Sequence, residues 1–166
     1  MIFQLPGTWA IAVNIAAWLV IHVVVSVSIA QMRPDSFNPR SWLYRQRTWE
    51  TAGKPYKSLL KVKKWKRLLP DGAAVFKRGF RKKRLRGRDA AYIQVFILET
   101  CRAELTHWVI LAFSAIFFVW NEWWIGLIMI AYGLAANMPC IVAQRYNRMR
   151  LTRTHQRYNR RGQANR

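Results

Sequence analysis

The chain has 166 residues, the size of one domain, with a formal net charge of +21 at pH 7 and a mean hydropathy of −0.06. High positive charge suits a soluble nucleic-acid-binding protein, but such a protein does not contain long uncharged apolar runs. The 28 Lys and Arg are segregated: residues 1–32 and 103–144 contain none, residues 33–88 hold 19, and residues 145–166 hold eight. This distribution is typical of a membrane protein.

The first predicted element is a transmembrane helix over residues 9–30, an uncharged apolar run long enough to cross a hydrocarbon core of about 30 Å. Its end, "SIA" at 28–30, also resembles a signal-peptide cleavage site, which would make the run removable. However, no cation precedes the run, and Asn14, Trp18 and His22 share a polar stripe that suits packing against other helices. We therefore expect a retained span.

A basic cytoplasmic segment is predicted over residues 33–100. It interleaves Trp, Leu and Val with cations, a pattern typical of helices that lie in the lipid headgroup layer. The run "FKRGFRKKRLRGRD" at 76–89 predicts attraction to an anionic membrane surface, with binding of an anionic substrate as the alternative. Cations mixed with aromatics also permit nucleic-acid binding. No known RNA- or DNA-binding signature is present, so no nucleic acid is expected among the partners.

Two further spans are predicted over residues 104–120 and 123–144, joined by the turn "NEWW". Pro139 is expected to kink the third span. The basic tail at 145–166 contains a second "QRYNR", which indicates a poorly ordered end.

The predicted fold class is an all-α integral membrane protein, with three transmembrane helices plus basic interfacial or cytoplasmic helices, forming a single membrane domain over residues 1–166. Because cations flank the spans on one side, the positive-inside rule places the N-terminus outside and the C-terminus in the cytoplasm.

The stretch "ETCRAELTHW" at 99–108 puts ionisable groups at the entrance of the second span. On a helix, Glu99 and His107 share a face, and Glu104 and His107 form an i, i+3 pair that can touch. A histidine at membrane depth beside a carboxylate suits a general base acting on an alcohol. The alternative is structural: a Glu99–Arg102 salt bridge and a packing role for His107. No metal site is expected, because E-x-x-H would need a second copy and further carboxylates.

The third predicted span carries small and amide side chains on one face, among them Gly133, Asn137 and Gln144, which predicts close packing against a neighbouring helix. Cys101 and Cys140 lack the spacing of a metal site or a disulfide framework, and we expect two buried thiols.

Three segments, "WKRLLPDG" (65–72), "ETCRAELTHW" (99–108) and "ANMPCIVAQRYNRMRLTR" (136–153), resemble in order and spacing the glycosyl-diaponeurosporenoate acyltransferases. The resemblance covers about residues 40–153. It implies a small enzyme of the bacterial cell membrane that places a fatty acyl chain on the sugar of a glycosylated carotenoid, the last step to staphyloxanthin-type pigments. This chain departs from the family pattern in its basic run at 77–88 and in its second "QRYNR". A different glycolipid acceptor is therefore left open.

The resemblance and the polar residues together predict O-acyl transfer. His107, oriented by Glu104 or Glu99, would deprotonate a sugar hydroxyl that attacks a thioester directly. An acyl-cysteine intermediate is the alternative, although Cys101 faces away from His107 and Cys140 lies on another span. The donor would be acyl-CoA or an acyl-carrier protein, with no other cofactor. Residues predicted to bind substrate supply cations, amides and aromatic rings: Trp65, Lys66, Arg102, Asn137, Gln144, Arg145, Tyr146, Asn147 and Arg148. Asp71, a carboxylate in the turn "LPDG", is a further candidate, with a structural role in that turn as the alternative.

A rival function from another class is a non-catalytic membrane adaptor or scaffold, whose basic surface binds anionic lipid or an acidic partner. That function predicts that charge matters and that His107 does not. The partners expected for the enzyme are the lipid bilayer, the acyl donor and the glycosylated acceptor. Three spans enclose little space, so a homo-oligomer is an alternative to the monomer.

Overall fold

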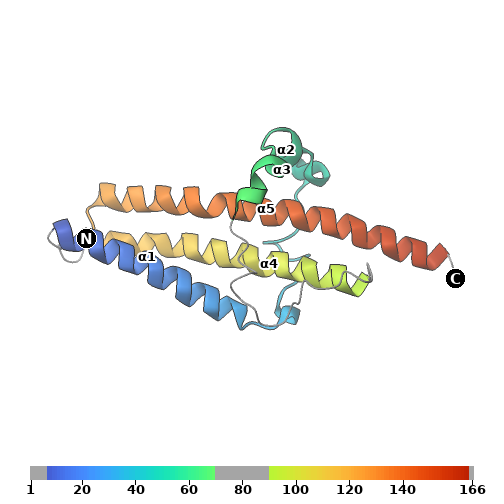
Figure 1. The fold of residues 1–166 in the computed structure, drawn as a ribbon, viewed down its shortest axis with the longest axis horizontal. Coiled ribbons are helices and arrows are strands. Elements are labelled where there is room, and N and C mark those ends of the chain that lie inside the picture. The colour runs from blue at the N-terminus through green and yellow to red at the C-terminus, as the bar shows by residue number, and fades with distance from the viewer. Residues whose placement is uncertain (1–6, 70–89, 165–166) are drawn as a thin grey trace. The chain divides into compact units, whose positions relative to one another are not determined.

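The computed structural model describes residues 7–69 and 90–164, and within these ranges its regular elements are all helices, with no strand (Figure 1). The predicted all-α class is confirmed. Asp71 and the basic run at 76–89 lie outside the described residues. The elements in chain order are α1 (Gly7–Ala30), η1 (Pro34–Ser36), η2 (Thr48–Gly53), α2 (Lys54–Ser58), α3 (Val62–Trp65), η3 (Lys66–Leu68), α4 (Ala90–Phe113), η5 (Ser114–Val119) and α5 (Trp123–Ala164).

Three helical segments are long and apolar enough to cross a membrane, which confirms the predicted number of spans: Gly7–Ala30, Ala90–Val119 and Trp123–Arg161. The second begins at Ala90, inside the segment predicted to be cytoplasmic. The reason is local, because residues 90–98, "AAYIQVFIL", are uncharged and continue the helix toward its start.

The predicted disorder of the C-terminal tail is wrong, since α5 continues as a helix to Ala164. Residues 140–161 contain neither Gly nor Pro and include seven Arg, which is a strong helix former. Pro139 lies inside α5 and does not end it.

The chain forms two compact units. The first unit contains residues 1–37 and 102–141, and the second contains residues 38–101 and 142–166. The borders fall inside α4 and α5, so each of these helices contributes to both units.

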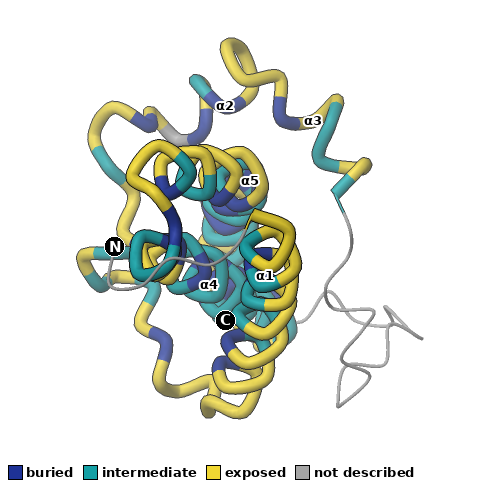
Figure 2. The backbone as a smooth tube through the Cα atoms, turned by 90° about the vertical axis from the view of Figure 1, so that its left-hand side faces the viewer, coloured by how far each residue is buried: buried dark blue, intermediate teal, exposed yellow. Residues whose placement is uncertain are grey.

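In the first unit, α1 packs beside the parts of α4 and α5 that belong to it (Figures 1 and 2). Trp18 of α1 is buried, with its ring centroid 4.8 Å from that of Phe117 and 5.2 Å from that of Tyr132. A Cβ at Gly133 would lie 3.2 Å from Trp18 Cη2, so the glycine permits this close approach. The opposite side of α1 is exposed and apolar, as a surface that faces lipid requires.

A pair of amides fastens α1 to the turn that follows η5. Asn14 Nδ2 donates to Asn121 Oδ1 at 3.0 Å, and Asn121 Nδ2 donates back to Asn14 Oδ1 at 2.8 Å. Trp120 Nε1 donates to the same Asn14 oxygen at 2.8 Å. Both asparagines are buried, and their polar atoms satisfy one another without introducing charge.

In the second unit, a chain of short helices packs against α5 through a core of Tyr56, Val62, Tyr146 and Met149. Gly53, at φ +85°, supplies the left-handed residue between η2 and α2. Trp42, Trp49 and Leu59 are exposed, which agrees with the apolar face predicted for the headgroup layer. Val62 of the same basic segment is instead fully buried in the core.

Candidate functional site

The central polar pair of the first unit joins His107 on α4 to Asn137 on α5. His107 Nδ1 lies 2.9 Å from Asn137 Oδ1. Asn137 is 1% exposed, and its Nδ2 donates to the carbonyl oxygen of Gly133 at 2.9 Å. A carbonyl oxygen only accepts, so this second bond fixes which end of the Asn137 amide faces His107.

The contact with Asn137 determines which nitrogen of the His107 imidazole carries the hydrogen. Since Asn137 presents its oxygen to His107, Nδ1 must carry the hydrogen and donate it. The lone pair then resides on Nε2, on the far side of the ring. This is the tautomer that a general base needs, held by a neutral partner.

Glu104 on α4 is buried, and its carboxylate accepts a hydrogen bond from an indole. Its Oε1 accepts a hydrogen bond from Trp108 Nε1 at 3.3 Å, along the i, i+4 direction of α4. His107 Nδ1 donates its hydrogen bond to Asn137 Oδ1 on α5. The i, i+3 contact between Glu104 and His107 stays a prediction, whereas the hydrogen bond of His107 Nδ1 joins two helices. Glu99 lies on the part of α4 that belongs to the second unit.

A second histidine also belongs to the first unit. His22 Nδ1 lies 2.8 Å from the carbonyl oxygen of Trp18, so this nitrogen also carries a hydrogen. The sequence indicated His22 only as part of a packing stripe.

Arg102, predicted to bind substrate, holds the chain that leaves α1. Its Nη2 donates to the carbonyl oxygen of Met32 at 2.8 Å, and its guanidinium carbon lies 5.3 Å from the ring centroid of Phe37. These contacts are structural.

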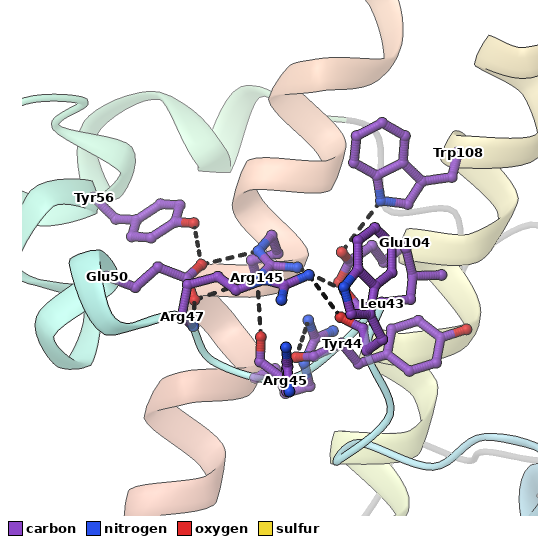
Figure 3. Close-up of polar contacts among 11 residues, drawn as sticks. Leu43, Tyr44, Arg45, Arg47, Glu50, Tyr56, Glu104, Trp108 and Arg145 are labelled. Atoms are coloured by element: carbon purple, nitrogen blue, oxygen red, sulfur yellow. Dashed lines mark hydrogen bonds and ion pairs between the residues drawn. The ribbon is translucent and has the colours of Figure 1, made fainter.

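The second unit is organised around Glu50, which is 1% exposed (Figure 3). Its Oε1 accepts from Arg145 Nε at 2.9 Å and from the Tyr56 hydroxyl at 2.6 Å. Its Oε2 accepts from Arg145 Nη2 at 3.2 Å and from the backbone N–H of Arg47. Glu50 thus receives the bidentate grip that suits a guanidinium and a carboxylate.

Burial alone would raise the pKa of Glu50, but the hydrogen bonds from Arg145, Tyr56 and Arg47 outweigh it and lower that pKa below its ordinary value of 4.5. Burial and the Glu50 carboxylate raise the pKa of Tyr56 from 10.0 to about 12. At neutral pH the carboxylate is therefore ionised, and the phenol keeps its hydrogen.

Arg145 and Arg148, both predicted to bind substrate, fasten the segment after residue 38 to α5. Arg145 Nη1 donates to the carbonyl oxygen of Leu43 at 3.0 Å, and its Nη2 to that of Arg45 at 3.2 Å. Arg148, 4% exposed, donates through Nη2 to the carbonyl oxygen of Tyr44 at 3.1 Å. These bonds give both arginines a structural role.

Other predicted residues do meet on α5. Lys66 Nζ donates to Asn147 Oδ1 at 2.8 Å and lies 5.3 Å from the ring centroid of Tyr146. Trp65 packs against the core and donates through Nε1 to the carbonyl oxygen of Leu60 at 2.7 Å. Gln144 is half-buried on α5.

Sequence reasoning missed Glu50, although a signal was present. Between residues 36 and 70, Glu50 is the only acidic residue among ten Lys and Arg. A single carboxylate in so basic a segment is expected to be paired and buried.

The fold and these polar groups define a helical membrane protein with a neutral histidine–amide pair in one unit and a charged network in the other. The chain belongs to the glycosyl-4,4'-diaponeurosporenoate acyltransferase family, whose sequence model matches residues 39–157. It is therefore an acyltransferase, and the resemblance found in the sequence is confirmed.

Proteins named glycosyl-4,4'-diaponeurosporenoate acyltransferase are similar over most of the chain. The one from Staphylococcus haemolyticus is 31% identical over 144 residues, covering 87% of this chain and 84% of that protein. The one from Staphylococcus aureus strain N315 is 31% identical over 147 residues, covering 88% of each. No solved structure matches the chain.

Proposed function

We propose that this protein transfers a fatty acyl chain from a thioester donor to a sugar hydroxyl of a glycosylated carotenoid or a related glycolipid. The names of its relatives support the acceptor class. The donor is acyl-CoA or an acyl-carrier protein. The enzyme spans the bacterial cell membrane three times, with the N-terminus outside and the C-terminus in the cytoplasm.

The observation that carries this mechanism is the His107–Asn137 pair. With Nδ1–H donated to Asn137, His107 Nε2 takes the proton of the sugar hydroxyl. The oxygen forms a bond to the thioester carbonyl carbon, and the carbon–sulfur bond then breaks. The imidazolium returns its proton to the departing thiolate, so the products are an O-acyl ester and a thiol. Asn137 keeps the ring in its productive orientation throughout.

Mass spectrometry of lipid extracts tests the proposal, using cells that express each variant at matched membrane levels. Wild-type protein should generate a glycolipid heavier by one fatty acyl chain. His107→Ala should lower that product by about 10²- to 10⁴-fold, the range for loss of a general base. His155→Ala is the matched control, because it removes a histidine from the second unit and should leave the product unchanged.

The variant Asn137→Leu distinguishes two roles of His107, that of a general base and that of a packing residue. This variant keeps His107 but releases its tautomer, so product formation should fall less than in His107→Ala and should gain a new pH dependence. If His107→Ala inserts normally and makes as much product as wild type, the general-base role is wrong. If no acylated product forms in any preparation while the protein still binds anionic membranes, the adaptor function takes its place.

A further inference from the structure

Two cations of the second unit, Lys66 and Arg150, lie close to the ring of Tyr146 on α5. Lys66 Nζ lies 5.3 Å from the ring centroid, and the guanidinium carbon of Arg150 lies 5.8 Å from it. Two more cations flank Lys66 in the α3–η3 segment. We call this group the Tyr146 cation cluster, and its members are Lys63, Lys66, Arg67 and Arg150.

The cluster has no carboxylate partner within residues 7–69 and 90–164. The ion pairs that involve Glu50 and Asp35 use Arg145 and Arg33 instead. Burial, followed by the neighbouring cations Arg150, Lys63 and Arg67, lowers the pKa of Lys66. A half-buried cation held among others costs free energy, and a bound anion would offset that cost.

The geometry of the cluster suits phosphate oxygens. Lys66 provides a compact charge that Asn147 Oδ1 holds in place at 2.8 Å, while Arg150 is exposed and provides a planar fork for two oxygens. Asn147 Nδ2 makes no hydrogen bond within the described residues, so it adds a neutral donor beside Lys66. Lys66 and Arg150 thus both lie near the ring of Tyr146, with Asn147 beside Lys66.

We infer that the Tyr146 cation cluster binds phosphate groups, and that these belong to the nucleotide part of a coenzyme A thioester. The second half of this inference rests on the proposed function. A phospholipid headgroup has the same phosphate chemistry and is the other source of such a ligand. Arg145 has no part in the site, because Glu50 and backbone carbonyls occupy its guanidinium.

Calorimetric titration of the purified full chain with coenzyme A and with pyrophosphate tests the site. Lys66→Gln and Arg150→Gln should each weaken binding about tenfold, the effect of losing one charge-assisted contact. Lys66→Arg should retain most of the affinity. Arg157→Gln is the matched control, since it removes one exposed cation from the same helix, seven residues after Arg150, and should stay within about twofold of wild type. If Lys66→Gln fails to fold, Arg150→Gln still tests the site, because Arg150 is exposed and its substitution should not disturb the fold.

The source of the phosphate is distinguished by vesicles that contain an anionic phospholipid. If Lys66→Gln and Arg150→Gln lose coenzyme A and pyrophosphate binding but sediment with vesicles like Arg157→Gln, the donor is the source. If they lose vesicle binding alone, the cluster takes headgroups and the donor assignment is overturned. If every variant binds all three probes like wild type, the cluster is not a phosphate site.

Failure of this inference is separate from failure of the proposed function. If wild-type protein binds coenzyme A through the cluster but never generates an acylated lipid, the phosphate site is supported and the proposed function is wrong. If the Lys66→Gln variant makes product and its rate depends on acyl-CoA concentration as in wild type, the proposed function is supported and the phosphate site is wrong.

Discussion

The two units solve the same problem, burying polar groups between helices, with different chemistry. In the first unit two contacts join neutral groups, Asn14 with Asn121 and His107 with Asn137, while the buried Glu104 accepts a hydrogen bond from the Trp108 indole. In the second unit the central contact joins ionised Glu50 to Arg145. The cost of an ion in a bilayer favours such amide contacts, because neutral amides can satisfy one another there without a charge to desolvate.

The neutral and the charged contacts also suit two different roles. A neutral amide can hold an imidazole in one tautomer and leave its basicity available, as catalysis at membrane depth requires. An arginine with five donors can instead bind several carbonyl oxygens and a carboxylate at once, which fastens irregular chain to a helix. Three experiments break or sharpen this comparison.

The largest effect is expected when the ion pair of the second unit is broken. Arg145→Met leaves Glu50 buried without its main partner and should lower the free energy of unfolding by about 3–5 kcal/mol. Urea unfolding in detergent, followed by circular dichroism, measures it. The double variant Glu50→Gln/Arg145→Met removes both charges and should recover much of the loss. Equal stability of the single and double variants would show that charge burial is not the cause.

A smaller effect is expected when the amide pair of the first unit is broken. Asn14→Leu leaves the Asn121 amide without its reciprocal partner and should cost about 1–2 kcal/mol, the upper range for hydrogen bonds between membrane helices. The same unfolding experiment measures it. Ile15→Leu is the control, since Ile15 is exposed on the outer side of α1. A loss as large as that of Arg145→Met would contradict the distinction between the units.

The smallest effect is expected in the pH dependence of unfolding, because burial cancels part of the stabilisation that hydrogen bonds give to Glu50. Its folded pKa is lowered, so its contribution is complete above the ordinary value of 4.5 and is lost as pH falls through the folded pKa. The stability difference between wild type and Glu50→Gln should therefore shrink on acidification.

Between about pH 6 and 8 that difference should be constant, since Tyr56 does not ionise until about pH 12. A Glu50→Gln variant that tracks wild type at every pH would show that the carboxylate contributes no pH-dependent stability.

The sequence predicts the helical spans of this protein better than it predicts their polar partners. Uncharged runs define the spans, because each residue adds independently to the cost of leaving the membrane. The helix that carries the second span begins earlier than the predicted span, at Ala90, because the uncharged residues 90–98 continue it past Glu99 and Arg102.

Partners between helices depend on rotation and depth, which one-dimensional periodicity does not contain. The sequence placed His107 and Asn137 on polar faces of separate helices, but it indicated Glu104 as the nearest group to His107. Glu50 and Arg145 are 95 positions apart, so no local pattern could pair them. A lone acid among cations was the only signal available.

Gly133 links packing and proton position in the first unit. Its missing side chain admits the Trp18 ring, and its carbonyl oxygen receives the amide hydrogen that turns Asn137 toward His107. A single added methyl group would also press on Ser114 and Leu111, at 3.3 and 3.4 Å. In evolutionary terms this position has little freedom to drift, whereas outward-facing Leu127 of the same helix can exchange with other apolar residues.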